Sequence, residues 1–212
     1  MKLSGIFVAL ALVALPGFAS ASVSTAVSFT KDSGGEGTSS FTRGFYFSLS
    51  DSVTIAALGW YDSGGDGLVS SHEIGIWNDT GQLLLSGMVS SGTADPLEGF
   101  FRYTASLTGD AALTPGSYVI GGLSTVSDRS YRRLDASSVI FGPSISYLSD
   151  ASNAQSAVFS EPTRPAGFDI GYFGPNFQYV SGVPETGTWG MLAVGFAVLG
   201  AASRRRARAL PV

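Results

Sequence analysis

The stretch Phe41–Leu49 reads FTRGFYFSL and is the clearest indication of the fold. Its apolar residues Phe41, Phe45, Phe47 and Leu49 share one parity along the chain. Successive side chains of a strand point to opposite faces of a sheet, so this period of two predicts a half-buried strand. The stretch therefore indicates a sheet with one face against a core.

Similar short runs recur along the chain between clusters of Gly, Asp, Asn and Pro, which tight turns require. No window from residue 22 to 183 has the 3.6-residue period of a helix. We therefore predict an all-β fold, a single jelly-roll-like β-sandwich over residues 22–180. The expected strands are Ser24–Thr30, Phe41–Leu49, Val53–Tyr61, Glu73–Trp77, Leu83–Val89, Phe100–Leu107, Ser117–Leu123, Ser138–Phe141, Ala157–Phe159 and Phe168–Phe173.

The segment Met1–Ala21 has the three parts of a secretory signal peptide. Lys2 is a positive n-region, Gly5–Leu15 is apolar, and Ala19 to Ala21 form a small-residue cleavage site. We therefore expect a cleavable signal peptide over residues 1–21 and an exported protein that begins at Ser22.

The segment 183–208 combines a polar motif, an apolar run and a basic cluster. Val183, Pro184 and Glu185 precede the run Gly190–Ala202. An apolar helix partitions into a bilayer, and arginines that follow it stay on the cytoplasmic side. We therefore predict a sorting signal with a short transmembrane helix, preceded by a domain outside the cell. The basic tail is Arg204, Arg205, Arg206 and Arg208.

This order of elements resembles the PEP-CTERM sorting domain. The resemblance implies processing by an exosortase, a membrane-embedded enzyme of Gram-negative bacteria, with Val183, Pro184 and Glu185 as the sorting motif. It also implies an inner-membrane intermediate, then release or attachment at the cell surface or in the extracellular matrix, with exopolysaccharide and biofilm. Thr186 departs from the family, which usually has a second proline there.

Two alternatives for this segment remain open. Residues 183–187 read VPETG, one conservative step from the Leu-Pro-x-Thr-Gly motif of sortase-anchored surface proteins. The other alternative is a plain membrane anchor or a buried C-terminal helix. The run of about 15 apolar residues is shorter than the roughly 20 that span a bilayer, and this length favours a buried helix.

Charge and cysteine content exclude several classes of function. The net charge is −4, and five of the 12 basic residues are Lys2 and the tail arginines. The remaining domain is strongly acidic and would repel phosphate backbones, so we expect no nucleic-acid partner. The chain has no cysteine, which excludes disulfides and thiol nucleophiles.

The segment Asp62–Glu73 reads DSGGDGLVSSHE and partly matches a calcium-binding loop. Asp62, Asp66 and Glu73 fall at positions 1, 5 and 12 of that template, and carboxylate oxygens are the ligands that Ca²⁺ prefers. Gly64 occupies the third position, where an oxygen ligand is expected. A polar hairpin loop built for its turn geometry is the competing interpretation.

Aromatic residues offer a candidate ligand platform. Trp60, Trp77 and Tyr131 could stack against the C–H faces of sugars, which makes a carbohydrate-binding module, calcium-assisted or not, the alternative function. In a sandwich without disulfides, however, most aromatic side chains must fill the core.

Nothing in the sequence marks a catalytic site. His72 is the only histidine, which we interpret as a surface-loop residue, and no Gly-x-Ser-x-Gly motif is present. We therefore expect a non-enzymatic surface or matrix protein.

Overall fold

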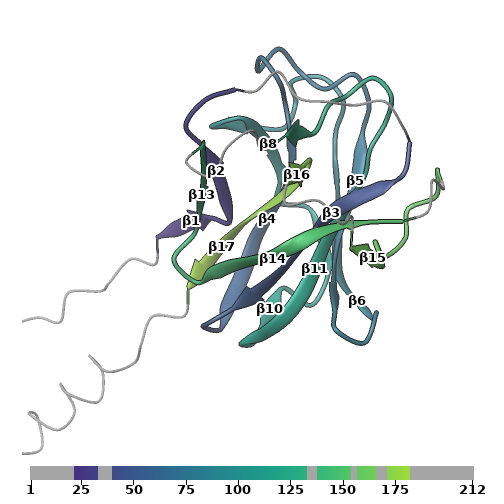
Figure 1. Ribbon diagram of the computed structural model, residues 1–212. Helices are drawn as coiled ribbons and strands as arrows, with labels where there is room; N and C mark the ends of the chain where they lie inside the picture. Colours follow the sequence, from purple (N-terminus) through teal and green to yellow (C-terminus); the bar gives the residue numbers. More distant parts are fainter. Residues whose placement is uncertain (1–21, 33–39, 133–137, 154–156, 166–170, 182–212) are drawn as a thin grey trace, which may run out of the picture.

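The computed structural model describes residues 22–32, 40–132, 138–153, 157–165 and 171–181. In these residues the protein is all-β, without helices, and every strand pairing is antiparallel. Two curled sheets face each other, an arrangement consistent with the predicted β-sandwich (Figure 1).

The first sheet runs in the order β1-β17-β4-β8-β7, with β10 also paired to β4. The second runs β15-β14-β3-β11-β5-β6-β9, and β12–β16 and β2–β13 form two small ribbons. The first sheet contains β1 (Val23–Thr25), β17 (Pro175–Ser181), β4 (Val53–Tyr61), β8 (Phe101–Thr104), β7 (Leu97–Glu98) and β10 (Ala112–Leu113). The second contains β15 (Arg164–Pro165), β14 (Ile145–Ser152), β3 (Thr42–Leu49), β11 (Gly116–Leu123), β5 (His72–Asn78), β6 (Leu83–Val89) and β9 (Leu107–Gly109). The ribbons are β12 (Tyr131–Arg132) with β16 (Tyr172–Phe173), and β2 (Val27–Phe29) with β13 (Val139–Phe141).

An aromatic core fills the space between the sheets. Phe45, Phe47 and Phe177 have no exposed surface, and the rings of Phe47 and Phe177 lie 5.1 Å apart between centroids. This contact joins β3 of the second sheet to β17 of the first. Each such ring contributes about 1.5–3 kcal/mol by burial, so packing supplies the stability that disulfides cannot.

Most predicted strands are present, and the alternation in β3 is confirmed by the burial of Phe45, Phe47 and Leu49. The strand predicted over Phe100–Leu107 is split into β8 and β9, and none forms over Ala157–Phe159.

The prediction missed β14 and β17, because their buried positions do not alternate cleanly. Asp150 in β14 and Asn176 in β17 are buried polar residues, and β14 also carries a bulge between Tyr147 and Ser149. A bulge inserts a residue and reverses the face of those that follow, which erases the period of two. Pro175 is tolerated because it is the first residue of its strand.

The domain has two distinct poles. Val23 pairs with Val180, so both ends of the described domain lie at a terminal pole, at the lower left of Figure 1. Along β17, Ser181 lies opposite Val53 and Pro175 opposite Trp60. The loop after β4 is thus at the other end, about 20 Å away at ~3.3 Å per residue. We call residues 62–71, 90–96 and 124–130, together with the strand residues His72 and Arg102 that bind them, the loop pole.

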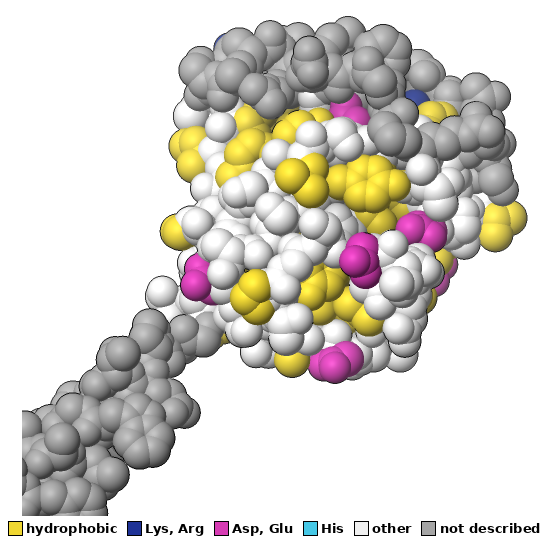
Figure 2. Space-filling model, turned by 60° about the horizontal axis from the view of Figure 1, so that its bottom comes forward, with side chains coloured by type: hydrophobic (Ala, Val, Ile, Leu, Met, Phe, Trp, Pro, Cys, Tyr) yellow, Lys and Arg dark blue, Asp and Glu magenta, His cyan; other side chains and the backbone are white. Residues whose placement is uncertain are grey.

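Figure 2 shows the face at the lower end of the molecule in Figure 1. Single Asp and Glu side chains are scattered over its described part, and apolar side chains lie between uncharged polar ones. The described part of this face shows no charged cluster, whereas the loop pole contains the buried pairs Arg102–Asp62 and His72–Asp128.

Candidate functional site

The loop 62–71 has a tightly turned backbone. Gly64, Gly65 and Gly67 have φ values of 86°, 70° and 112°, a region that disfavours residues with a Cβ. A Cβ on Gly67 would lie 3.1 Å from the carbonyl carbon of Gly92. The backbone of Leu68 also exchanges two hydrogen bonds with Gly92, so this loop packs directly on the loop 90–96.

Three aspartates bind the backbone of this loop, and each comes from a different segment. Asp32 accepts a hydrogen bond from Gly64 N (3.0 Å) and Asp62 accepts one from Gly67 N (3.1 Å). Asp128 accepts two, from Val69 N (2.8 Å) and Ser70 N (2.7 Å). Ionised carboxylates form strong hydrogen bonds with backbone N–H groups, so negative charge holds this loop in shape.

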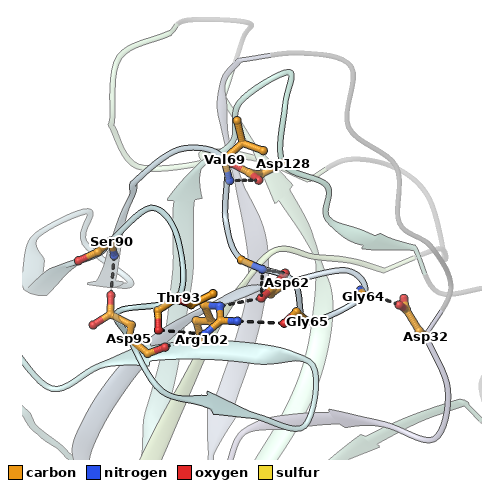
Figure 3. Close-up of polar contacts among 11 residues, drawn as sticks. Asp32, Asp62, Gly64, Gly65, Val69, Ser90, Thr93, Asp95, Arg102 and Asp128 are labelled. Carbon is orange, nitrogen blue, oxygen red and sulfur yellow. Dashed lines mark hydrogen bonds and ion pairs between the residues drawn. The ribbon is translucent and has the colours of Figure 1, made fainter.

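Arg102 joins two loops from below (Figure 3). Its Nε donates to Asp62 Oδ2 at 2.7 Å, Nη1 to the carbonyl of Asp95 at 2.9 Å, and Nη2 to the carbonyl of Gly65 at 3.1 Å. Both members of the Arg102–Asp62 ion pair are almost fully buried. A buried pair of this kind stabilises the fold only while both partners are present.

His72 is a further buried ionisable residue at the loop pole. Its ring has no exposed surface and stacks on Trp60, with 4.0 Å between centroids and 2° between planes. Nδ1 donates to the carbonyl oxygen of Leu123 at 2.8 Å, because a carbonyl can only accept. Nε2 lies 3.1 Å from Asp128 Oδ2.

This position corrects the interpretation of His72 as a surface-loop residue. His72 is the first residue of β5, where its side chain faces the core and stacks on Trp60 of the opposite sheet. Because both ring nitrogens have partners, neither is available to a serine nucleophile, as a catalytic triad would require.

The contacts of Asp128 also set its ionisation. Burial raises its pKa, but hydrogen bonds from His72, Val69 and Ser70, with the charge of His72, outweigh burial and hold that pKa below its ordinary value. Asp128 is therefore a carboxylate under neutral conditions.

A polar pocket of about 310 Å³ lies between the loop 62–71 and the segment 124–130. Asp62 and Asp128 contribute to its wall, but their oxygens accept the hydrogen bonds described above. Its other polar side chains are Ser63, Asp66, Ser127 and Arg129. A ligand here would meet hydroxyl groups and charges of both signs.

The predicted calcium site is wrong in this geometry. Asp62 is paired with Arg102, and Glu73 lies in β5 beside Ser86 and Met88, where it lines a different pocket from Asp62 and Asp66. The template assumes a helix after the loop, whereas here a strand begins at His72 and directs Glu73 away. No group of three His, Cys, Asp or Glu side chains suited to a metal occurs among the described residues.

The predicted sugar platform of Trp60, Trp77 and Tyr131 is also wrong, since all three rings are buried. Trp60 stacks on His72, Trp77 packs against Phe159, and Tyr131 stacks on Phe29 at 3.6 Å between centroids. The faces of these rings are covered by core residues, so they are not accessible to a glycan.

The sequence reasoning missed Arg102 and Asp128. The sequence does contain an indication of Arg102, because it is a lone charge in the run FFRYT. In the structure its side chain is buried in β8. The sequence contains no such indication of Asp128, since it lies in a polar segment without alternating apolar residues.

The predicted signal peptide, the sorting motif Val183, Pro184 and Glu185, and the arginine tail lie outside the described residues. Among the residues that are described, no helix is long and apolar enough to cross a membrane. Comparisons of the chain with protein-family models, curated proteins and solved structures found no match.

Proposed function

We propose that this chain is an exported, non-enzymatic surface or matrix protein, a jelly-roll-like sandwich that an exosortase sorts and processes. The tail carries the proposal: a Val183–Glu185 motif, an apolar run and an arginine cluster, in that order. The exosortase and the membrane are its first partners, and extracellular polysaccharide is the setting of the mature protein.

The position of the domain relative to this tail supports the proposal. β17 ends at Ser181, two residues before Val183, so the motif follows the folded unit directly. Val23 pairs with Val180 at the same edge, and cleavage before Ser22 and after Val183 would leave that pairing intact. Processing at both ends is thus compatible with a complete sandwich.

The loop pole supports a presenting rather than a catalytic role. Its buried Asp62, Arg102, His72 and Asp128 contact one another or the backbone, so their polar atoms serve the loops. This pole is also the end farthest from Ser181, where it would face away from a membrane-anchored tail.

Intact-mass measurement of the protein purified from its native host tests the sorting proposal. We expect a chain that starts at Ser22 and lacks the tail from about Pro184–Gly187 onward. In a Pro184→Ala variant the uncut chain should accumulate in the membrane fraction, whereas Pro115→Ala, in an exposed turn, should be processed normally.

A wild-type chain that keeps Val212 in the membrane would contradict the proposal and indicate a plain anchor. Cleavage between Thr186 and Gly187 would instead favour a sortase.

Carbohydrate binding is a second candidate function, favoured by the polar pocket at the loop pole. Binding of glycans in an array should be lost in Asp66→Ala and Ser127→Ala and retained in Ser106→Ala, which lies by another pocket. Binding that survives both pocket substitutions would place the glycan elsewhere on the domain.

A further inference from the structure

In the segment 124–130, the side chain of Asp128 contacts the loop 62–71 and His72. At its start, Ser124 is hydrogen-bonded to Phe41, and at its end Ser130 is buried. Between them, Val126, Ser127 and Arg129 are exposed. Asp128 is the residue that turns inward and reaches Val69, Ser70 and His72.

The hydrogen bonds of His72 and Asp128 require a shared proton. Nδ1 must keep its hydrogen, because it faces the carbonyl of Leu123. Nε2 and Asp128 Oδ2 are 3.1 Å apart, and this contact is favourable only if one of them carries a proton. Without that proton, a lone pair faces a carboxylate, and a buried negative charge loses its partner.

Among the described residues that pack around His72, the neighbours other than Asp128 are uncharged groups. β4 presents Trp60, β6 presents Val89 opposite His72 in register, and β11 presents the carbonyl of Leu123. In the described part of the chain, the charged residues that line the same pocket as Asp128 are Asp62, Asp66 and Arg129. Asp62 is bound to Arg102, so the ionic contact of His72 is with Asp128.

We propose that the His72–Asp128 pair is a pH-sensitive latch, which opens when the pair loses its shared proton and releases the segment 124–130 from the loop 62–71. This device goes beyond the sorting function and does not depend on it. Because Asp128 and Arg129 line the polar pocket, opening the latch would change the shape of that pocket. Acid would open the latch a second time, when Asp128 is protonated and the carboxylate that accepts from Val69 and Ser70 is lost.

The single histidine makes the proton directly observable. In full-length protein labelled with ¹⁵N-histidine in detergent micelles, NMR of the ring nitrogens should show a protonated Nδ1 throughout and an Nε2 that loses its proton as the pH rises. The measurement should cover the range from about pH 5 to about pH 9. A ring that keeps one protonation state over this range would overturn the proposal.

Limited trypsin digestion reports the release of the segment, because Arg129 lies within it and is exposed. After correction with a free peptide spanning residues 124–134, cleavage after Arg129 should be slow while Nε2 is protonated and should accelerate as Nε2 is deprotonated. A rate that does not follow the NMR titration would contradict the proposal, whatever the variants show.

Two variants separate the latch from a general loss of structure. In Asp128→Asn, cleavage after Arg129 should be fast and independent of pH, because the amide cannot hold the shared proton. Asp110→Asn is the matched control, since Asp110 also accepts a backbone hydrogen bond, from Ala112, but has no histidine partner. It should keep the wild-type pH profile, and an equal change in both variants would argue against a specific latch.

Discussion

The aromatic core and the loop pole are stabilised in different ways. The core consists of rings such as Phe45, Phe47 and Phe177, whose burial is favourable in any orientation that fills the space. The loop pole depends on Arg102 and three aspartates, whose contacts are directional and charged. Loss of one ring leaves a smaller contact area, whereas loss of one charge leaves its partner buried and unpaired. The loop pole should therefore be the less tolerant region, although it buries less apolar surface.

We expect the largest effect from breaking the buried Arg102–Asp62 ion pair. Arg102→Met removes the partner of Asp62 and should lower the free energy of unfolding by about 3–5 kcal/mol, as is typical when a buried ion pair is broken. Urea unfolding of the variant measures this loss. The double variant Asp62→Asn with Arg102→Met should recover part of the stability, because no buried charge remains. If it is less stable than Arg102→Met, charge burial is not the cause.

Backbone geometry should give the next largest effect. Gly67→Ala should cost about 2 kcal/mol, because φ is 112° and the new Cβ would meet Gly92 at 3.1 Å. Gly92→Ala is the matched control, since φ is 77° there but no atom lies within 4 Å of a Cβ. Thermal unfolding should rank Gly67→Ala below Gly92→Ala. The reverse order would show that the two loops do not pack as described.

A conservative change in the aromatic core should cost less. Phe47→Leu keeps a smaller apolar side chain and should lower the free energy of unfolding by about 1 kcal/mol, because neighbouring rings can partly fill the space left by the ring. Urea unfolding alongside Arg102→Met makes the comparison direct. A loss equal to that of Arg102→Met would remove the proposed difference between the two regions.

The smallest effect is expected from acid. Because the folded state holds the pKa of Asp128 below its ordinary value, Asp128 contributes stability that is fully present above the unfolded pKa, near 3.9, and is lost as the pH falls through the folded pKa. Unfolding free energies measured by urea from about pH 5 downward should therefore fall less steeply in Asp128→Asn than in the wild type. Equal slopes would mean that Asp128 does not contribute to acid sensitivity.

The sequence predicted best where residues interact with their own strand neighbours. β4 and β6 have the predicted bounds, because apolar runs between turn residues report local structure. β14 and β17 were missed, since a bulge interrupts the alternation in β14 and the buried Asn176 of β17 depends on Val27 and Tyr103, far along the chain. The same cause misdirected the site, because a calcium-loop spacing in Asp62–Glu73 contains no information about Arg102, 29 residues beyond Glu73.

The all-β character and the predicted sorting tail follow from the sequence alone, because periodicity, turn residues and the order of apolar and basic segments are local properties of the chain. Tertiary structure decided which aromatic rings are buried, which aspartates bind the loop 62–71, and that the only histidine pairs with Asp128. These contacts join β4, β5, β8 and a distant loop, and a charge or ring acquires its role from the partner that the fold brings to it.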